Sequence, residues 1–343
     1  MKILRHLKVP TGDILVVEGE KGKLELLSLG DYGKDVNLKA DCLGLKRTIE
    51  KVCHTKLLPL EEKWVITIST QYGCSMNCSM CDVPKVGKGI NATEKDLIKQ
   101  VLTAIKLHPE VESSKRLNIH FARMGEPTFN PNILDATKWM HTHLNNEFHI
   151  HPVVSTMMPK YNEWLKTFIH TWMRMKNRLF KGEAGLQLSI NSTNESERNT
   201  MFNNQALPLK YIAKMMEGII PNGRKITLNF IVNGLYEINP EILREYFDPD
   251  DYIIKLTPMH RTSTAISNYN IPEGIDLDTV FHSVVYNHEK HLKEAGYDVL
   301  VFFASKEEDL GRITCGNAIL SGTLPEVDYE EVVASQKRLL KAL

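Results

Sequence analysis

The sequence predicts an α/β fold, in which β/α units form a parallel sheet with helices outside it. From residue 64 to residue 304, strand-like apolar segments alternate with segments of helical periodicity, which is the pattern of β/α units. Residues 1–60 differ, because their short alternating segments are separated by Gly and Lys, as in hairpins. We expect the parallel sheet to be open or closed into a barrel, with the active site at the carboxyl ends of its strands.

The amino-terminal region, residues 1–60, is predicted to be a small β-rich extension. DILVVEG (13–19) and KLELLSLGD (23–31) alternate apolar and polar residues on either side of a turn. WVITIST (64–70) is typical of a buried strand and leads directly into a loop rich in cysteine. We expect the core to cover residues 61–322 and a helical tail to cover residues 323–343.

The remaining elements alternate along the chain. TEKDLIKQVLTAIKLH (93–108) has helical periodicity, and Thr93 with Asp96 resembles a capping box at its start. Further strands are expected over 116–125, 149–156, 184–191, 225–234, 251–259 and 297–304, and further helices over 133–144, 160–180, 208–218, 240–247 and 277–295.

Composition restricts the class of protein. No run of about 18 apolar residues is present, so no membrane span is expected. Six cysteines at irregular spacing, with no export signal, argue against a disulfide framework and favour a reducing cytoplasm. The 42 basic residues balance the 42 acidic residues, which counts against nucleic acid as the main partner, although a local basic face is compatible with this balance.

Three cysteines are concentrated in GCSMNCSMCD (73–82), at Cys74, Cys78 and Cys81. Such a cluster in a cytosolic protein favours metal binding or catalysis over a disulfide. A structural zinc site is closed by four ligands, and the other cysteines are isolated in the sequence. Three thiolates instead suit a 4Fe–4S cluster that keeps one iron open. The alternatives are a zinc site and unliganded thiols.

The C-x3-C-x2-C spacing on a loop after the first strand of a β/α run resembles the signature of the radical SAM superfamily. That resemblance implies a partial (β/α)6-type barrel, a 4Fe–4S cluster and S-adenosylmethionine (SAM). ARMGEPTFN (122–130) adds a Gly-Glu-Pro motif. With it, the chain from Glu50 to GRITCGNAIL (311–320) resembles the RlmN/Cfr family of radical SAM RNA methyltransferases.

The resemblance implies the residues that contact SAM. A carboxylate at the end of a strand, as at Glu126, can form a charge-assisted hydrogen bond with the SAM amino group. VVSTMMP (153–159) and LQLSINSTNESERNTMF (186–202) look like the family's next two strands, and in IIKLTPMH (253–260) a histidine stands where the family has an asparagine. The implied SAM-binding residues are Gly125, Glu126, Ser155, Ser189, Asn191 and His260.

Cys315 in GRITCGNAIL matches the family's methyl-carrying cysteine. In the family, one SAM methylates this sulfur, and the radical from a second SAM removes hydrogen from the S-methyl group. The methylene radical then adds to carbon 2 or carbon 8 of adenine. Tethering the radical on the protein supplies proximity. Glu50 stands near the family's proton-handling glutamate, so the resemblance implies that it takes the proton lost when the ring becomes aromatic again.

The sequence departs from the family at two further points. The family's second cysteine, which resolves the adduct through a disulfide, is replaced by Thr67, and Cys53 is the nearest alternative thiol. The first 60 residues also do not resemble the helical accessory domain of ribosomal-RNA members. The resemblance implies RNA as substrate and an electron donor such as flavodoxin, and because of these departures we keep two alternatives. One is the same chemistry on a nucleotide, small metabolite or peptide, and the other is a non-catalytic module stabilised by a metal.

Overall fold

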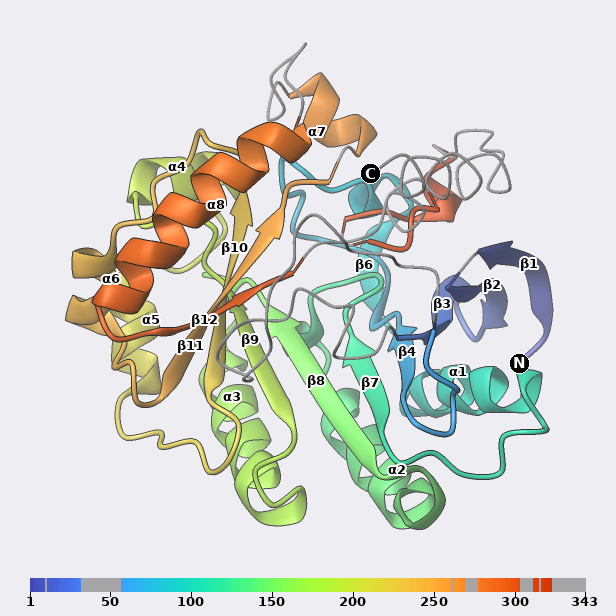
Figure 1. Cartoon of the computed structure of the whole chain (residues 1–343). Helices are drawn as coiled ribbons and strands as arrows, with labels where there is room; N and C mark the ends of the chain where they lie inside the picture. The colour runs from blue at the N-terminus through green and yellow to red at the C-terminus, as the bar shows by residue number, and fades with distance from the viewer. Residues whose placement is uncertain are drawn as a thin grey trace, which may run out of the picture.

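The computed structural model describes residues 1–9, 11–31, 57–260, 262–268, 277–302, 311–314 and 316–322. The described strands form one sheet of ten strands in the order β1-β2-β3-β4-β7-β8-β9-β10-β11-β12, and a separate hairpin of β5 and β6 (Figure 1). Strand order therefore follows chain order, with β1 and β12 at the two ends of the sheet.

The parallel part of the sheet confirms the predicted fold class. Each of its strands pairs in parallel with the next, and Figure 1 shows them fanning around a common centre. The strands are β4 (Trp64–Ile68), β7 (Leu117–Phe121), β8 (Ile150–Thr156), β9 (Gly185–Ser189), β10 (Ile226–Val232), β11 (Tyr252–Pro258) and β12 (Asp298–Val301).

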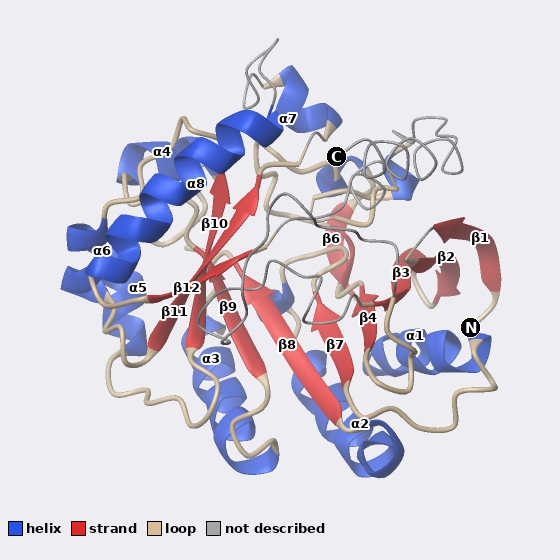
Figure 2. Cartoon of the chain, in the orientation of Figure 1, coloured by secondary structure: helices blue, strands red, loops and turns tan. Residues whose placement is uncertain are grey.

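Helices flank the outside of this sheet (Figure 2). The predicted capping box is confirmed at the first of them: Asp96 N donates to Thr93 Oγ1 (3.1 Å), and Thr93 N donates to Asp96 Oδ2 (3.2 Å). The predicted helix over 160–180 begins later and continues into a π-helical turn at Met175–Leu179. The predicted helices are observed as α1 (Glu94–Leu107), α2 (Asn132–Phe148), α3 (Leu165–Arg174), α5 (Leu209–Met216), α6 (Pro240–Tyr246) and α8 (Leu277–Glu294).

Two short helices were not predicted. α4 (Glu195–Met201) follows β9, and α7 (Ser263–Ser267) follows β11. Each has a capping side chain, because Asn194 accepts from Ser196 N and Thr262 accepts from Ala265 N. Helices of this length show too few turns for a hydrophobic period to be recognised.

The amino-terminal region is β-rich as predicted, and it extends the sheet of the barrel. β1 (Ile3–Val9), β2 (Gly12–Gly19) and β3 (Gly22–Gly30) are antiparallel, and β3 pairs with β4 from Leu26–Ile68 to Gly30–Trp64. The boundaries proposed after residues 60 and 322 stay predictions, and residues 323–343 lie outside the described part.

The main core lies between the parallel strands and the helices. It takes alternate residues of each strand, such as Ile66 and Ile68 of β4 and Leu228 and Phe230 of β10, all with no exposed surface. Within the described residues, none of the helices combines the length and the apolar character needed to cross a membrane.

Candidate active site

The inner face of the parallel strands carries polar side chains. Because side chains alternate along a strand, the residues between the core positions point away from the helices. A barrel with a filled interior carries bulky branched residues there. Here several of the inner positions hold polar residues that are only half-buried, a character suited to contact with a polar ligand. These residues are Thr67, His120, Ser155, Gln187, Ser189, Asn229 and Lys255.

The cysteine loop is held between β5 (Gln71–Gly73) and β6 (Lys88–Asn91), which follow β4. Cys74 N donates to Gly87 O (3.0 Å), and Cys81 N donates to Cys78 O (3.1 Å). Gly73 has φ +80°, and a Cβ there would lie 2.1 Å from Gly87 O. Glycine is therefore required for the hairpin to close beside Cys74.

The three cysteines form no disulfide and are half-buried. Cys74 and Cys78 pack against a small apolar cluster that contains Met157, and Cys74 and Cys81 pack against the main core. Burial raises the pKa of the Cys74 thiol to about 11, and the Glu126 carboxylate acts in the same direction. Iron binding would replace that proton. Since each thiolate of a cluster binds a different iron, three sulfurs need not converge on one point.

This thiol set fits a cluster better than a single ion. Among the described residues, no group of three His, Cys, Asp or Glu converges so as to hold one metal ion. A structural zinc site would require four converging ligands. Three separated thiols on one loop, at the carboxyl edge of the barrel, are the donor set that a three-thiolate 4Fe–4S cluster requires.

The Gly-Glu-Pro motif follows β7 and is tied to the next strand. Glu126 is buried, and its carboxylate accepts from Thr128 N (3.1 Å), Thr128 Oγ1 (2.7 Å) and Met157 N (3.1 Å). Burial raises the pKa of Glu126, while hydrogen bonds from Thr156 and Thr128 oppose that rise. Gly125 has φ +99°, and a Cβ there would lie 2.6 Å from Gln71 Cβ. The motif thus joins β5, β7 and β8, and the contact of Glu126 with SAM stays a prediction.

The other predicted SAM-binding residues lie at the same edge. Ser155 is near the end of β8, Ser189 ends β9, and Asn191 follows it. Asn191 is buried with φ +63°, and its Oδ1 accepts from Ile231 N (3.2 Å). His260 follows β11 and is half-buried. Because carboxyl ends of parallel strands meet at one edge, the fold places these residues on the side of the sheet where the cysteine loop begins.

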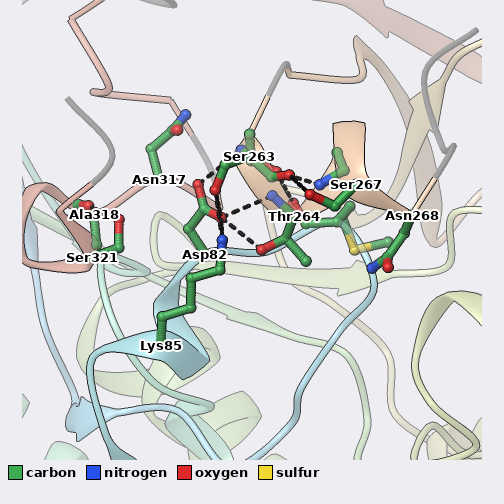
Figure 3. Close-up of polar contacts among 12 residues, drawn as sticks. Asp82, Lys85, Ser263, Thr264, Ser267, Asn268, Asn317, Ala318 and Ser321 are labelled. Atoms are coloured by element: carbon green, nitrogen blue, oxygen red, sulfur yellow. Dashed lines mark hydrogen bonds and ion pairs between the residues drawn. The ribbon is translucent and has the colours of Figure 1, made fainter. Parts of the chain in front are cut away.

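Asp82, directly after Cys81, joins the cysteine loop to α7 (Figure 3). Its buried carboxylate accepts from Ser263 N (3.1 Å), Thr264 N (3.0 Å) and Thr264 Oγ1 (2.6 Å), and from Lys85 Nζ (2.8 Å). Burial alone would raise the pKa of Asp82, but the hydrogen bonds from Lys85, Thr264 and Ser263 outweigh it and hold that pKa well below its usual range.

The backbone of Asp82 also reaches the carboxyl-terminal segment. Asp82 N donates to Gly316 O (2.8 Å). Gly316 has φ +84°, and a Cβ there would lie 3.3 Å from Met80 O and 3.7 Å from Cys81 Cα. Gly316, the residue after Cys315 in sequence, therefore lies against the loop that carries the three cysteines.

Some predicted residues fall outside the described part of the chain. These are Glu50, Cys53 and Cys315, whose roles stay predictions. The structure also brings forward inner-face residues that the sequence reasoning missed, namely His120, Gln187, Asn229 and Lys255. The period-two pattern of their strands contains this signal, since each stands between two core positions.

Comparison with known proteins shows that the chain is similar in sequence to RNA methyltransferases. No protein-family model matches the chain. The chain is 26% identical over 205 residues to the dual-specificity RNA methyltransferase RlmN of Marinomonas sp. (strain MWYL1), covering 56% of this chain and 51% of that protein. It is 23% identical over 335 residues to RlmN of Pseudomonas fluorescens (strain SBW25), covering 93% and 82%. The chain thus spans about half the length of the first relative.

Among solved structures, the chain is similar to a radical SAM methyltransferase from Sphaerobacter thermophilus. The TM-score is 0.58 at 18% identity, and the match covers 92% of this chain and 80% of the other. At this identity the likeness concerns the fold alone.

Proposed function

We propose that the chain is a SAM-dependent radical methyltransferase of the RlmN/Cfr type, a proposal supported by its identity of 26% and 23% to two RlmN enzymes. Its reaction is methylation of an sp2 carbon, and the proposed acceptor is adenine in RNA. The cofactors are a 4Fe–4S cluster and SAM, which supply a one-electron reductive cleavage when bound. The electron comes from a donor such as flavodoxin, and the proposed compartment is the cytoplasm.

The residues of this chain have distinct proposed tasks. Cys74, Cys78 and Cys81 hold the cluster through their thiolates. The SAM amino acid moiety binds along the carboxyl edge of the barrel, at Gly125, Glu126, Ser155, Ser189, Asn191 and His260. Glu126 accepts hydrogen bonds from Thr128 and Met157. It therefore connects the ends of β7 and β8, in addition to any contact with SAM.

Cys315 is the proposed methyl carrier. Its thiolate displaces S-adenosylhomocysteine from a first SAM and becomes S-methylcysteine. The methyl group then gives up one hydrogen atom to the 5′-deoxyadenosyl radical that reductive cleavage of a second SAM would supply, and the resulting methylene radical adds to the acceptor carbon. The adduct radical would give one electron back through the cluster as the acceptor carbon loses its proton. Attack of a second thiol on the sulfur of Cys315 then breaks the S–C bond, forms a disulfide and leaves the released carbon to take up a proton as the new methyl group. Glu50 is proposed to take the proton that the acceptor carbon loses when the ring becomes aromatic again.

The observation that carries this proposal is the hydrogen bond from Asp82 N to Gly316 O at 2.8 Å. Asp82 follows a cluster cysteine, and Gly316 follows Cys315 in sequence. A tethered methyl group must be close to the radical source. Two segments more than 200 residues apart meet at the two positions that this chemistry requires to be neighbours.

Peptide mass spectrometry tests the proposal on protein isolated without oxygen. The expected result is a methyl group on the sulfur of Cys315, or a nucleoside linked to it through a methylene group. A Cys315→Ala variant gives the background. An unmodified thiol, in a preparation with intact cluster and added SAM, would contradict the methyl-carrier assignment.

A second candidate keeps the chemistry and changes the acceptor to a nucleotide, a small metabolite or a peptide. Thr67 favours it, because threonine cannot form the disulfide that releases the product in the RNA-modifying family. Thr67 stands on the inner face of β4, paired in register with His120 of β7. Cys53 or a thiol from solution must then release the product. The mass of an adduct trapped on Cys315 decides between the two acceptors.

A further inference from the structure

A buried ion pair joins the amino-terminal strands to the barrel. The Glu25 side chain on β3 has no exposed surface, and that of Arg123, just after β7, is 2% exposed. Arg123 donates to Glu25 Oε1 from Nε (3.1 Å) and from Nη2 (2.9 Å). Removing two charges from water is expensive, so such a pair persists only when its remaining hydrogen-bonding groups are also satisfied.

The remaining groups of the pair bind the segment that contains Cys315. Glu25 accepts from Ile319 N (3.2 Å) and from Leu320 N (2.6 Å). Arg123 Nη1 donates to Arg312 O (2.9 Å). In sequence these contacts lie on both sides of Cys315, three residues before it and four and five residues after it.

The amino-terminal strands also supply an apolar platform for the same segment. Ile313 and Ile319 pack with Val9 of β1, Ile14 and Val16 of β2, and Leu27 of β3. Since side chains alternate along a strand, Glu25 and Leu27 share the face of β3 that receives this segment. Leu24 and Leu26 of the same strand point into the main core.

Internal hydrogen bonds brace the segment. Asn317 is buried and donates to Thr314 Oγ1 (2.7 Å), while its Oδ1 accepts from Arg312 Nη1 (3.0 Å). Together with the bond from Asp82 N to Gly316 O, the described residues 311–314 and 316–322 are fixed at the amino-terminal strands and at the cysteine loop.

We infer that the Glu25–Arg123 pair is a positioning device, and that β1–β3 form the platform on which the Cys315-bearing segment is held beside the cysteine loop. This inference rests on the proposed function only for the role of Cys315. A tethered methyl group reacts efficiently only when its attachment point is held in place. The task of the amino-terminal strands is therefore to hold the segment on either side of Cys315.

Amide hydrogen exchange tests the anchor without any catalytic readout. The variants are Glu25→Gln and the double variant Glu25→Leu/Arg123→Met, in which no buried charge is left unpaired. Because hydrogen bonds to charged groups are lost, the Ile319 and Leu320 amides should exchange about tenfold faster or more. The control is Glu289→Gln, a buried glutamate paired with Lys293 on α8 (2.9 Å). Unchanged exchange at Ile319 and Leu320 in the double variant would overturn the inference.

A second measurement separates positioning from general destabilisation. In the double variant we expect iron per chain and SAM cleavage to equal those of the unmodified protein, while the methylated fraction of Cys315 falls about tenfold or more. An equal methylated fraction in both proteins would overturn the positioning role. If Cys315 carries no methyl group in the unmodified protein, the proposed function fails, and the exchange experiment still decides whether the pair anchors the segment.

Discussion

The two faces of the parallel sheet are built from the same strands but have opposite characters. Along β10, Leu228 and Phe230 face the helices with no exposed surface, whereas Asn229 between them is half-buried on the inner face. The same alternation holds in β4 and in residues 186–189 of β9, whereas in β8 it is interrupted at Val153, which is buried. The outer face supplies apolar burial, the main stabilising term in folding, and the inner face presents half-buried polar side chains.

The largest expected effect is a loss of iron and of methylation activity, from a substitution in the cysteine loop. Cys78→Ala removes one of three proposed cluster ligands, so iron per chain should fall and methylation should drop by more than about a thousandfold. The fold should persist, since Cys78 is a partly exposed residue of a loop. Iron analysis and circular dichroism check this. Ser75→Ala on the same loop, where Ser75 is exposed, is the control, and full iron content in Cys78→Ala would contradict the ligand assignment.

The outer face should govern stability. Phe230→Ala opens a cavity in the main core, so we expect the free energy of unfolding to fall by about 3–5 kcal/mol. Asn229→Ala, one residue away on the inner face, should change it by less than about 1 kcal/mol. Denaturant titration of the two variants measures the difference. If both variants lose the same free energy of unfolding, the outer face does not contribute more to stability than the inner face, and the comparison fails.

A smaller effect on stability is expected from the titration of His151, which is half-buried at the amino end of β8. Burial lowers its pKa to about 4, and the charges of Arg116 and Arg224 act in the same direction. The unfolded chain, with a pKa near 6.5, therefore binds the proton first as pH falls. Between about pH 6.5 and pH 4 the free energy of unfolding should decrease by about 2 kcal/mol from this group.

Chemical denaturation across that range checks the effect of His151. In His151→Gln the corresponding part of the pH dependence should disappear, while His143→Gln, at an exposed position on α2, should retain it. A pH dependence identical in all three proteins would show that His151 titrates normally in the folded state.

The smallest expected effect is a weakening of SAM binding when one hydroxyl group is removed from the inner face. Ser189→Ala should weaken SAM binding by about tenfold or less, the value of one hydrogen bond, and should change the free energy of unfolding by less than about 0.5 kcal/mol. Calorimetric titration with SAM measures the first quantity. Ser113→Ala, at an exposed position before β7, is the control. Wild-type affinity in Ser189→Ala would remove Ser189 from the proposed SAM site.

Much of the fold followed from local patterns. The helix over 93–108 was predicted to within a residue at either end and with its capping box, because the 3.6-residue period and the cap lie within a few turns of chain. The strand over 116–125 ends at Phe121 instead, since the next residues form the turn in which Gly125 has φ +99°. β1, the β5–β6 hairpin, α4 and α7 were missed, because β1 lacks a clear alternation and the others are short.

The candidate site also has features that could be predicted from the sequence and features that could not. The three cysteines were recognisable from their spacing, because that motif is complete within a few residues of one loop. The Gly-Glu-Pro motif is weak by itself and was recognisable only in combination with the cysteines. Which neighbours they meet was not recognisable. Asp82 appears in the sequence as an ordinary charged residue, and only the fold shows it buried against α7 with five donors around its carboxylate.

The sequence by itself determined the β/α order and the cysteine loop, because these depend on interactions between residues close together in the chain. Only the tertiary structure decided that β3 pairs with β4 and that Glu25 meets Arg123, 98 residues away. It also decided that residues 312, 319 and 320 close around that pair. A buried charge finds its partner through the order of strands in the sheet, and no local pattern contains that order.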